Sequence, residues 1–388
     1  MMKKQYSHLV LFLSLCTLTA CNDSKNEDSI DPDPLPPSIT YHVEGYAELG
    51  AFDHNSTLTV FPLDKSLAHI EEQAYGGKVE TDYGLFSASG NMKFQESLYF
   101  EVQVTGNFFN GTKGRRSEHK TTLRAINHVI NHDDEERSIN RYIKLPATNV
   151  NIFTQLTAAR ICTLLKKAAG YNEMSHTITD IYRNASEQAL KEVLTAFSIS
   201  DIYVSMLSID PTRASFSQYN APASMMAAVS NILLTSVDEE LLDTFFTEWD
   251  KDFAPDGRID NEDIKESIRD GQQSLKYTNV YKQLDSFYKA YDFKSDFPEF
   301  WKFVDRNGDG ILDKQDKPDD FEITEEELTP SKQQCIQLLE QVNKYLRDFL
   351  QTECVWEANF CGAIGPIPDY PTTLVPTDSE VYEIWTAA

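Results

Sequence analysis

The chain has 388 residues, of which 41% are hydrophobic and 11% aromatic, so it is long enough for two or three globular domains with sizeable cores. Its formal net charge of −26 at pH 7 argues against nucleic acid as a partner, because binding of nucleic acid needs basic patches. The same charge suits divalent cations, although the solubility of an exported protein explains most of it.

The first 20 residues predict an export signal. Lys3 and Lys4 give it a positive start, and the stretch 9–16 is a short apolar core that is too short to span a bilayer as a stable helix. The sequence Leu-Thr-Ala-Cys at 18–21 then resembles the lipobox of bacterial lipoproteins. This resemblance implies cleavage before Cys21 and lipid on that cysteine, which would anchor the protein to a membrane. An ordinary secretory signal that is cut elsewhere is the alternative.

Residues 21–37 predict an acidic tether. The stretch holds five acidic residues and four prolines with almost nothing apolar, so it cannot bury enough surface to offset the entropy of ordering. We expect it to hold the folded part away from the membrane. Asn22 after the cysteine favours the outer membrane of the cell envelope over retention in the inner membrane. The protein could face either the periplasm or the cell surface.

Residues 38–147 predict a β-structure. The stretches 39–46, 56–63, 79–86 and 97–106 alternate polar with apolar residues, which is the strand period. Gly45, the sequence Val-Phe-Pro-Leu at 60–63 and the segment 81–86 resemble the carboxypeptidase-regulatory or transthyretin-like β-sandwich. The resemblance implies an accessory or adhesive module rather than a catalyst.

The remainder predicts helices. Residues 148–236 form a helical domain with amphipathic helices at 151–169 and 179–197 and a buried helix at 221–234, and another helix follows at 275–291. Residues 331–388 predict a long helix over 331–350 and an extended tail. The expected fold class is therefore a multidomain α+β protein, in which an N-terminal β-sandwich precedes an α-helical domain with EF-hand-like loops.

The stretch 305–316 predicts a calcium loop within an EF-hand-like region, 237–330. Calcium takes six to eight oxygen ligands, and Gly310 stands at position 6, where the chain must turn sharply. Pro318 follows the loop at once and disfavours a helix, so the pattern resembles a dockerin-type half-hand more than a full EF-hand. The alternative is a solvated acidic turn. The candidate ligands at positions 1, 3, 5, 7, 9 and 12 are Asp305, Asn307, Asp309, Ile311 through its backbone carbonyl, Asp313 and Asp316.

A second stretch, 250–263, has the same pattern with two extra residues. Helices over 240–249 and 261–269 are expected on its two sides, as in an EF-hand. Either the loop binds calcium or it keeps the EF-hand fold without the ion. Ile259 and Leu312 stand at position 8 of the two loops, where a short two-strand bridge would join a pair. The candidate ligands are Asp250, Asp252, Asp256, Arg258 through its backbone carbonyl, Asp260 and Asp263.

Four cysteines remain after the signal and the lipidated residue: Cys162, Cys335, Cys354 and Cys361. An even number in an exported chain favours disulfides, and Cys354 and Cys361 are the nearest pair in sequence.

The sequence carries no catalytic signature, since it lacks a zinc-protease motif, a nucleophile elbow and a phosphate-binding glycine loop. We therefore expect a calcium-binding lipoprotein of the cell envelope, with Ca²⁺ in a structural role and no enzymatic activity. One alternative is an adhesion or scaffold module that binds a protein or a glycan through the sandwich. The other is an exported hydrolase with structural calcium, which a pocket with a buried, pKa-shifted carboxylate or histidine would favour.

Overall fold

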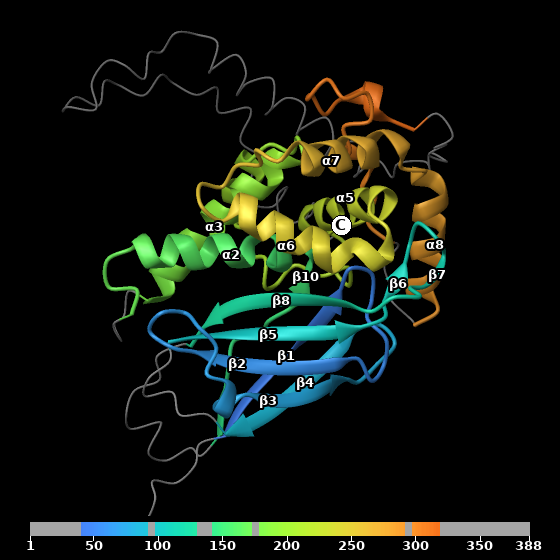
Figure 1. Ribbon diagram of the computed structural model, residues 1–388. Helices are drawn as coiled ribbons and strands as arrows, with labels where there is room; N and C mark the ends of the chain where they lie inside the picture. The colour runs from blue at the N-terminus through green and yellow to red at the C-terminus, as the bar shows by residue number, and fades with distance from the viewer. Residues whose placement is uncertain (1–39, 92–97, 130–141, 173–177, 292–296, 319–388) are drawn as a thin grey trace, which may run out of the picture.

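The computed structural model describes residues 40–91, 98–129, 142–172, 178–291 and 297–318. A sheet region comes first in the chain and a helical region follows, so the fold is α+β, as predicted. The helices gather on one side of a curled sheet (Figure 1). The predicted signal, tether, C-terminal helix and tail lie outside the described residues, as do Cys21, Cys335, Cys354 and Cys361.

The main sheet has eight strands in the order β10-β1-β4-β3-β2-β5-β8, with β9 also pairing β1. Neighbouring strands are antiparallel, apart from the two pairs in which β1 runs parallel to β9 and to β10. A two-stranded ribbon of β6 and β7 extends from it. The strands are β1 (Thr40–Glu48), β2 (Thr57–Leu63), β3 (Tyr75–Val79), β4 (Leu85–Asn91), β5 (Tyr99–Gly106), β6 (Phe109–Asn110), β7 (Arg115–Arg116), β8 (Thr121–His128), β9 (Tyr142–Lys144) and β10 (Val150–Asn151).

The continuous strand expected over 79–86 is wrong, because residues 80–84 form the turn between β3, which ends at Val79, and β4, which begins at Leu85. Gly84 has φ +89°, a left-handed conformation that glycine adopts without strain. The side chain of Thr81 accepts the N–H of Leu85 at 3.0 Å, which removes that donor from a strand ladder. Strand β8 was not expected. Its residues are almost all buried or half-buried because helices pack on it, so polar and apolar positions do not alternate cleanly.

The expected helices of the described residues are present with ends shifted by up to about five residues, and the short helix α4 was not expected. Asn151 caps α2 by accepting the N–H of Thr154 at 3.0 Å, and Asn220 caps α5 in the same way. Helix α5 is buried over most of its length, as its small apolar residues predicted. The helices are α2 (Ile152–Lys167), α3 (Ile178–Ala196), α4 (Ile202–Leu207), α5 (Ala221–Ser236), α6 (Leu242–Phe253), α7 (Glu262–Ser274) and α8 (Tyr277–Lys289), with 3₁₀ turns η1 (Glu71–Gln73), η2 (Glu239–Leu241), η3 (Trp301–Phe303) and η4 (Lys314–Asp316).

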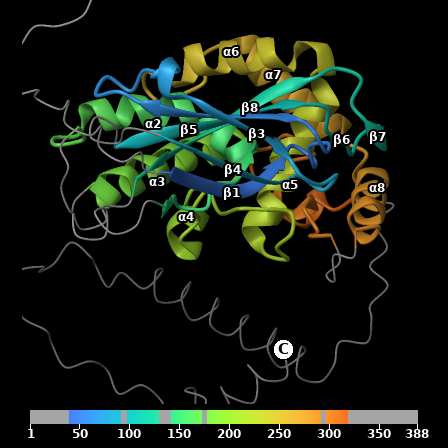
Figure 2. The same cartoon turned by 90° about the horizontal axis from the view of Figure 1, so that it is seen from below.

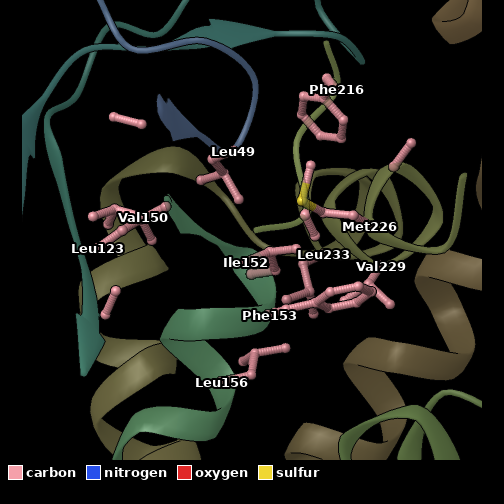
Figure 3. Packing of buried hydrophobic residues seen from close by; sticks show 14 of the residues in the cluster. Leu49, Leu123, Val150, Ile152, Phe153, Leu156, Phe216, Met226, Val229 and Leu233 are labelled. Carbon is pink, nitrogen blue, oxygen red and sulfur yellow. The ribbon is translucent and has the colours of Figure 1, made fainter. Parts of the chain in front are cut away.

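The sheet and the helices share their hydrophobic core, which consists of a main cluster and a smaller one between the sheet, α2 and α3. Val102 and Leu123 from the sheet belong to the same buried cluster as Phe153 of α2 and Met226 of α5, and all four side chains have 0% exposure. Figure 3 shows Leu123, Phe153 and Met226 in this packing, and Figure 2 shows the sheet lying across the helices. The boundary predicted between 147 and 148 falls inside this core, because Val150 in β10 pairs with Ala47 in β1. Over the described residues, no helix is both long and apolar enough to cross a membrane.

A substitution at Gly45 tests the close contact between β1 and the segment that leads to the helices. A Cβ at Gly45 would lie 2.2 Å from the backbone oxygen of Thr148, so Gly45→Ala must displace the backbone. We expect it to lower the free energy of unfolding by about 2–4 kcal/mol, measured by denaturant unfolding. Gly76→Ala is the matched control, since its Cβ would meet only the oxygen of Leu58 at an ordinary 3.5 Å. Equal stability of the two variants would contradict the close approach at Gly45.

Candidate functional site

The loop 305–316 follows an aromatic anchor. Trp301 and Phe303 in η3 are each 8% exposed, and Val304 is 1% exposed. They fix the start of the loop against the core, and η4 closes its end. The entering element is thus a 3₁₀ turn rather than an α-helix.

Two buried carboxylates close the loop. Asp305 is 2% exposed and accepts the N–H groups of Gly308 at 2.8 Å and Gly310 at 2.9 Å. Asp316 is 1% exposed and accepts the N–H of Arg306 at 2.8 Å and, with its other oxygen, that of Asp313 at 3.0 Å. Backbone N–H groups offset part of the cost of burying these two carboxylates.

The side chains between them repeat one local hydrogen bond. Asn307, Asp309 and Asp313 each accept the N–H of the residue two positions later, at 2.9, 2.8 and 2.6 Å. Gly308 and Gly310 have φ +75° and +79°, so the chain makes two left-handed turns that suit glycine. A Cβ at Gly310 would meet nothing within 4 Å, so its backbone conformation rather than lack of space favours glycine there. All five predicted side-chain ligands are therefore tied to the loop's own backbone.

The carboxylates of the loop do not converge on a single point. Throughout the described ranges, no group of three or more His, Cys, Asp or Glu side chains is close enough together to hold a metal ion. Of the two apolar loop residues, Ile311 is 61% exposed. Leu312 is half-buried and packs against the main core.

The stretch 250–263 lies between two α-helices, as predicted, but α6 is longer than expected. Asp250 and Asp252 therefore belong to α6 rather than to the loop. The Asp252 carboxylate accepts the N–H groups of Asp260 at 2.8 Å and Asn261 at 3.1 Å, which ties the end of α6 to the start of α7. Asp256 accepts the N–H of Arg258 at 3.1 Å. The side chains of Asp260 and Asp263 are exposed.

The predicted bridge between Ile259 and Leu312 is wrong. The isolated β-bridges of the described residues join other pairs, and helix α7 separates the two loops. Loop 250–263 precedes α7, whereas Gly308 lies beside the side chain of Gln273 near the helix's other end, where an added Cβ would be 2.9 Å from Nε2. Thirteen residues of α-helix span roughly 18–20 Å, which is too far for a backbone pair.

Asp250 belongs to a chain of charges on the sheet. Its carboxylate binds Arg124 of β8, whose guanidinium also lies 3.7 Å from Glu101 of β5. Glu101 in turn contacts His69 at 3.1 Å. Burial raises the pKa of Asp250 to about 6 against the opposing charge of Arg124. Burial also acts to raise the pKa of Glu101, but the hydrogen bond with His69 and the charge of Arg124 outweigh it and lower this pKa.

Two further titratable groups are buried in the interior. Glu48, at the end of β1, is 0% exposed and accepts the N–H of Phe216 at 3.1 Å and the hydroxyl of Ser215 at 3.2 Å. Burial raises the pKa of Glu48 to about 8. Burial lowers the pKa of His128, at the end of β8, to about 4, and its Nε2 lies 3.0 Å from the Thr179 hydroxyl. A carboxyl with no exposure cannot meet a substrate unless its surroundings move, so Glu48 acts here as an anchor for the segment before α5.

Sequence reasoning missed these buried groups for a common reason. Glu48 is separated from Phe216 by 168 positions, and Arg124 from Asp250 by 126, so no local spacing marks either contact. The only signal available was an acidic residue directly after an alternating strand. Of the four cysteines, Cys162 lies in the described ranges, and its thiol is free.

Comparisons of the chain with protein-family models, with curated proteins and with solved structures found no significant match.

The pH dependence of stability tests the environment of Glu48. Its folded-state pKa of about 8 lies above the ordinary 4.5. The stability that the shifted pKa of Glu48 contributes is therefore full below about pH 4.5 and is lost as the pH rises to 8. We expect Glu48→Gln to unfold with a free energy roughly 3–5 kcal/mol higher than the wild type at pH 9, and to lose that advantage at pH 5.

The control for this comparison is Glu44→Gln on the same strand. The hydrogen bond with Lys144 is the main cause that lowers the pKa of Glu44. Glu44→Gln should therefore not raise the free energy of unfolding at high pH. Denaturant unfolding at pH 5, 7 and 9 gives the comparison. Parallel curves for wild type and Glu48→Gln over this range would show that Glu48 keeps an ordinary pKa in the folded protein.

Proposed function

We propose that this chain is a calcium-binding lipoprotein of the cell envelope, in which the loop 305–316 binds one Ca²⁺ in a structural role. The observation that supports this is the hydrogen bonding of the loop, which fixes all five side-chain ligands to backbone N–H groups from within it. The proposed ligands are Asp305, Asn307, Asp309, Asp313, Asp316 and the backbone carbonyl of Ile311.

The electrostatics of the loop favour a divalent cation. Four aspartates lie within 12 residues, and the hydrogen bonds that the two buried ones accept all come from backbone groups. Each carboxylate oxygen has more than one acceptor site, so these hydrogen bonds leave lone pairs for a metal. Binding would draw the side chains towards the ion from their present separate positions.

The position of the loop suggests what the ion does. Calcium that binds only the folded form adds stability by mass action, about 1.4 kcal/mol at ten times the dissociation constant. Asp316 is shorter than the glutamate usual at position 12, which suggests the weak affinity of extracellular modules, roughly 10⁻⁴–10⁻³ M. The ion would hold the segment after Val304 against the core through the η3 anchor.

The remaining parts of the proposal rest on the sequence. The signal and lipobox-like stretch support a membrane anchor at Cys21. The resemblance of residues 38–147 to the carboxypeptidase-regulatory sandwich supports a non-catalytic sheet module. The resemblance of the two loops to EF-hands supports a calcium-binding helical region.

Terbium luminescence tests the calcium site directly. Trp301 lies four residues before Asp305 and can sensitise an ion in the loop. We expect emission that calcium displaces, and its loss in Asp309→Ala because a ligand is removed. Asp180→Ala is the control, since it deletes an exposed carboxylate that pairs with Arg183. Emission that survives in Asp309→Ala would exclude this loop as the site.

Thermal unfolding tests the structural role. In 10 mM calcium the wild type should melt about 2–5 °C higher than in chelator, since a gain of 1 kcal/mol corresponds to a few degrees for a chain of this size. Asp309→Ala should show no such difference. Identical melting of the wild type in calcium and in chelator would remove the structural role from the proposal.

Fractionation of cells that process lipoproteins tests the anchor. We expect the full chain in the membrane fraction and Cys21→Ser in the soluble fraction, because acyl chains contribute about 0.8 kcal/mol per buried CH₂. Cys16→Ser, which changes a cysteine within the predicted signal, serves as the control and should remain with the membrane. A soluble wild type would contradict lipidation at Cys21.

A further inference from the structure

The backbone of loop 250–263 is bound by a cation of the protein itself. Arg160 of α2 is 4% exposed, and its Nη1 donates to the carbonyl oxygens of Ala254 at 3.2 Å and Pro255 at 2.9 Å. The ammonium group of Lys167 also donates to Pro255, at 3.3 Å. Calcium takes a backbone carbonyl at position 7 of such loops, here Arg258, whereas Ala254 and Pro255 precede Asp256 at position 5. A guanidinium has five donors and a permanent charge, so it can serve several such oxygens at once.

The other side of the guanidinium is held by Glu192 of α3. Arg160 Nε and Nη2 donate to the two carboxylate oxygens of Glu192 at 2.7 and 2.9 Å, which is a bidentate pair. Gly257 lies against this carboxylate, since an added Cβ would be 2.1 Å from it. Gly257 also has φ +78°, so the turn of the loop needs glycine both for its backbone and for the approach of Glu192.

Two of the candidate ligands of this loop already have partners within the protein. Asp250 binds Arg124 on the sheet, and Asp252 accepts two backbone N–H groups at the start of α7. The Asp250 carboxylate and the carbonyls at the turn are thus each bound by an arginine of the protein.

We propose that the Arg160 guanidinium takes the place of a metal ion in loop 250–263, so that the EF-hand-like region binds one Ca²⁺ rather than two. The stoichiometry rests on the function proposed above, whereas the role of Arg160 does not. Because arginine stays charged at any physiological pH, the order of this loop is independent of calcium. Calcium then controls only the loop 305–316.

Amide hydrogen exchange tests the role of Arg160 in the full chain. The reporters are the N–H groups of Gly257, which donates to Phe253 at 2.9 Å, and of Asp260 and Asn261. Arg160→Met should accelerate their exchange roughly tenfold or more, as expected for the loss of charged hydrogen bonds. Arg183→Met is the matched control, because it removes an exposed arginine–carboxylate pair, and it should change nothing at these amides.

Two results would overturn the proposal. The first is unchanged exchange of these amides in a folded Arg160→Met variant. The second is protection of the same amides by calcium in the wild type, because a loop held by Arg160 should exchange equally in calcium and in chelator. This second comparison needs no variant and decides the matter even if Arg160→Met fails to fold.

Terbium luminescence distinguishes the role of Arg160 from the proposed calcium binding of loop 305–316. In the double variant Asp305→Asn/Asp309→Ala, we expect no emission sensitised by Trp249, which precedes Asp250 directly. Emission there that calcium displaces would make loop 250–263 a metal site and refute the role of Arg160, while calcium binding by the chain would stand. No emission from the wild type would instead count against the proposed function, and hydrogen exchange would still decide the role of Arg160.

Discussion

Burial of one sheet face against α2, with α3 and α6 beside it and α5 packed behind α2, is the contact on which the rest of the structure depends. Each fully buried aliphatic or aromatic side chain contributes about 1.5–3 kcal/mol, and the shared core draws its members from both regions, as Val102, Phe153 and Met226 illustrate. Because α2 begins directly after β10, the strand that joins the sheet also sets where the first helix lies. The sheet and the helices therefore cannot separate without exposing this core.

Several buried charges of the helical region meet a partner from a distant segment. Arg124 joins Asp250 to Glu101, and Arg160 joins Glu192 to the turn of loop 250–263. Breaking a buried ion pair leaves an uncompensated charge, so such pairs fix which helix lies against which strand. Burial raises the pKa of Glu48, because the hydrogen bonds from Phe216 and Ser215 only partly oppose this effect and neither partner is a cation.

The two acidic loops are ordered by different means. Loop 305–316 is organised by its own side chains, which accept backbone N–H groups within the loop. Loop 250–263 is organised from outside, by Arg160 and Glu192 on the neighbouring helices. The first arrangement leaves carboxylate lone pairs for a cation, whereas the second satisfies the turn's carbonyls with a cation of the protein. Similar sequence patterns are thus ordered by different contacts in the two loops.

The sequence alone determined the features that depend on near neighbours. The pattern of apolar residues predicted α2, α3, α5 and α8, and Gly310 among the aspartates of 305–316 predicted a sharp turn in that loop. Tertiary structure decided what depends on distant residues: the turn at 81–84, strand β8, the position of Asp250 on Arg124, the separation of the loops by α7, and the burial of Glu48. Local hydrogen bonds and helix periodicity depend on residues that are close in sequence, so the sequence alone predicts them. The partner of a buried charge is fixed only when folding brings remote segments together.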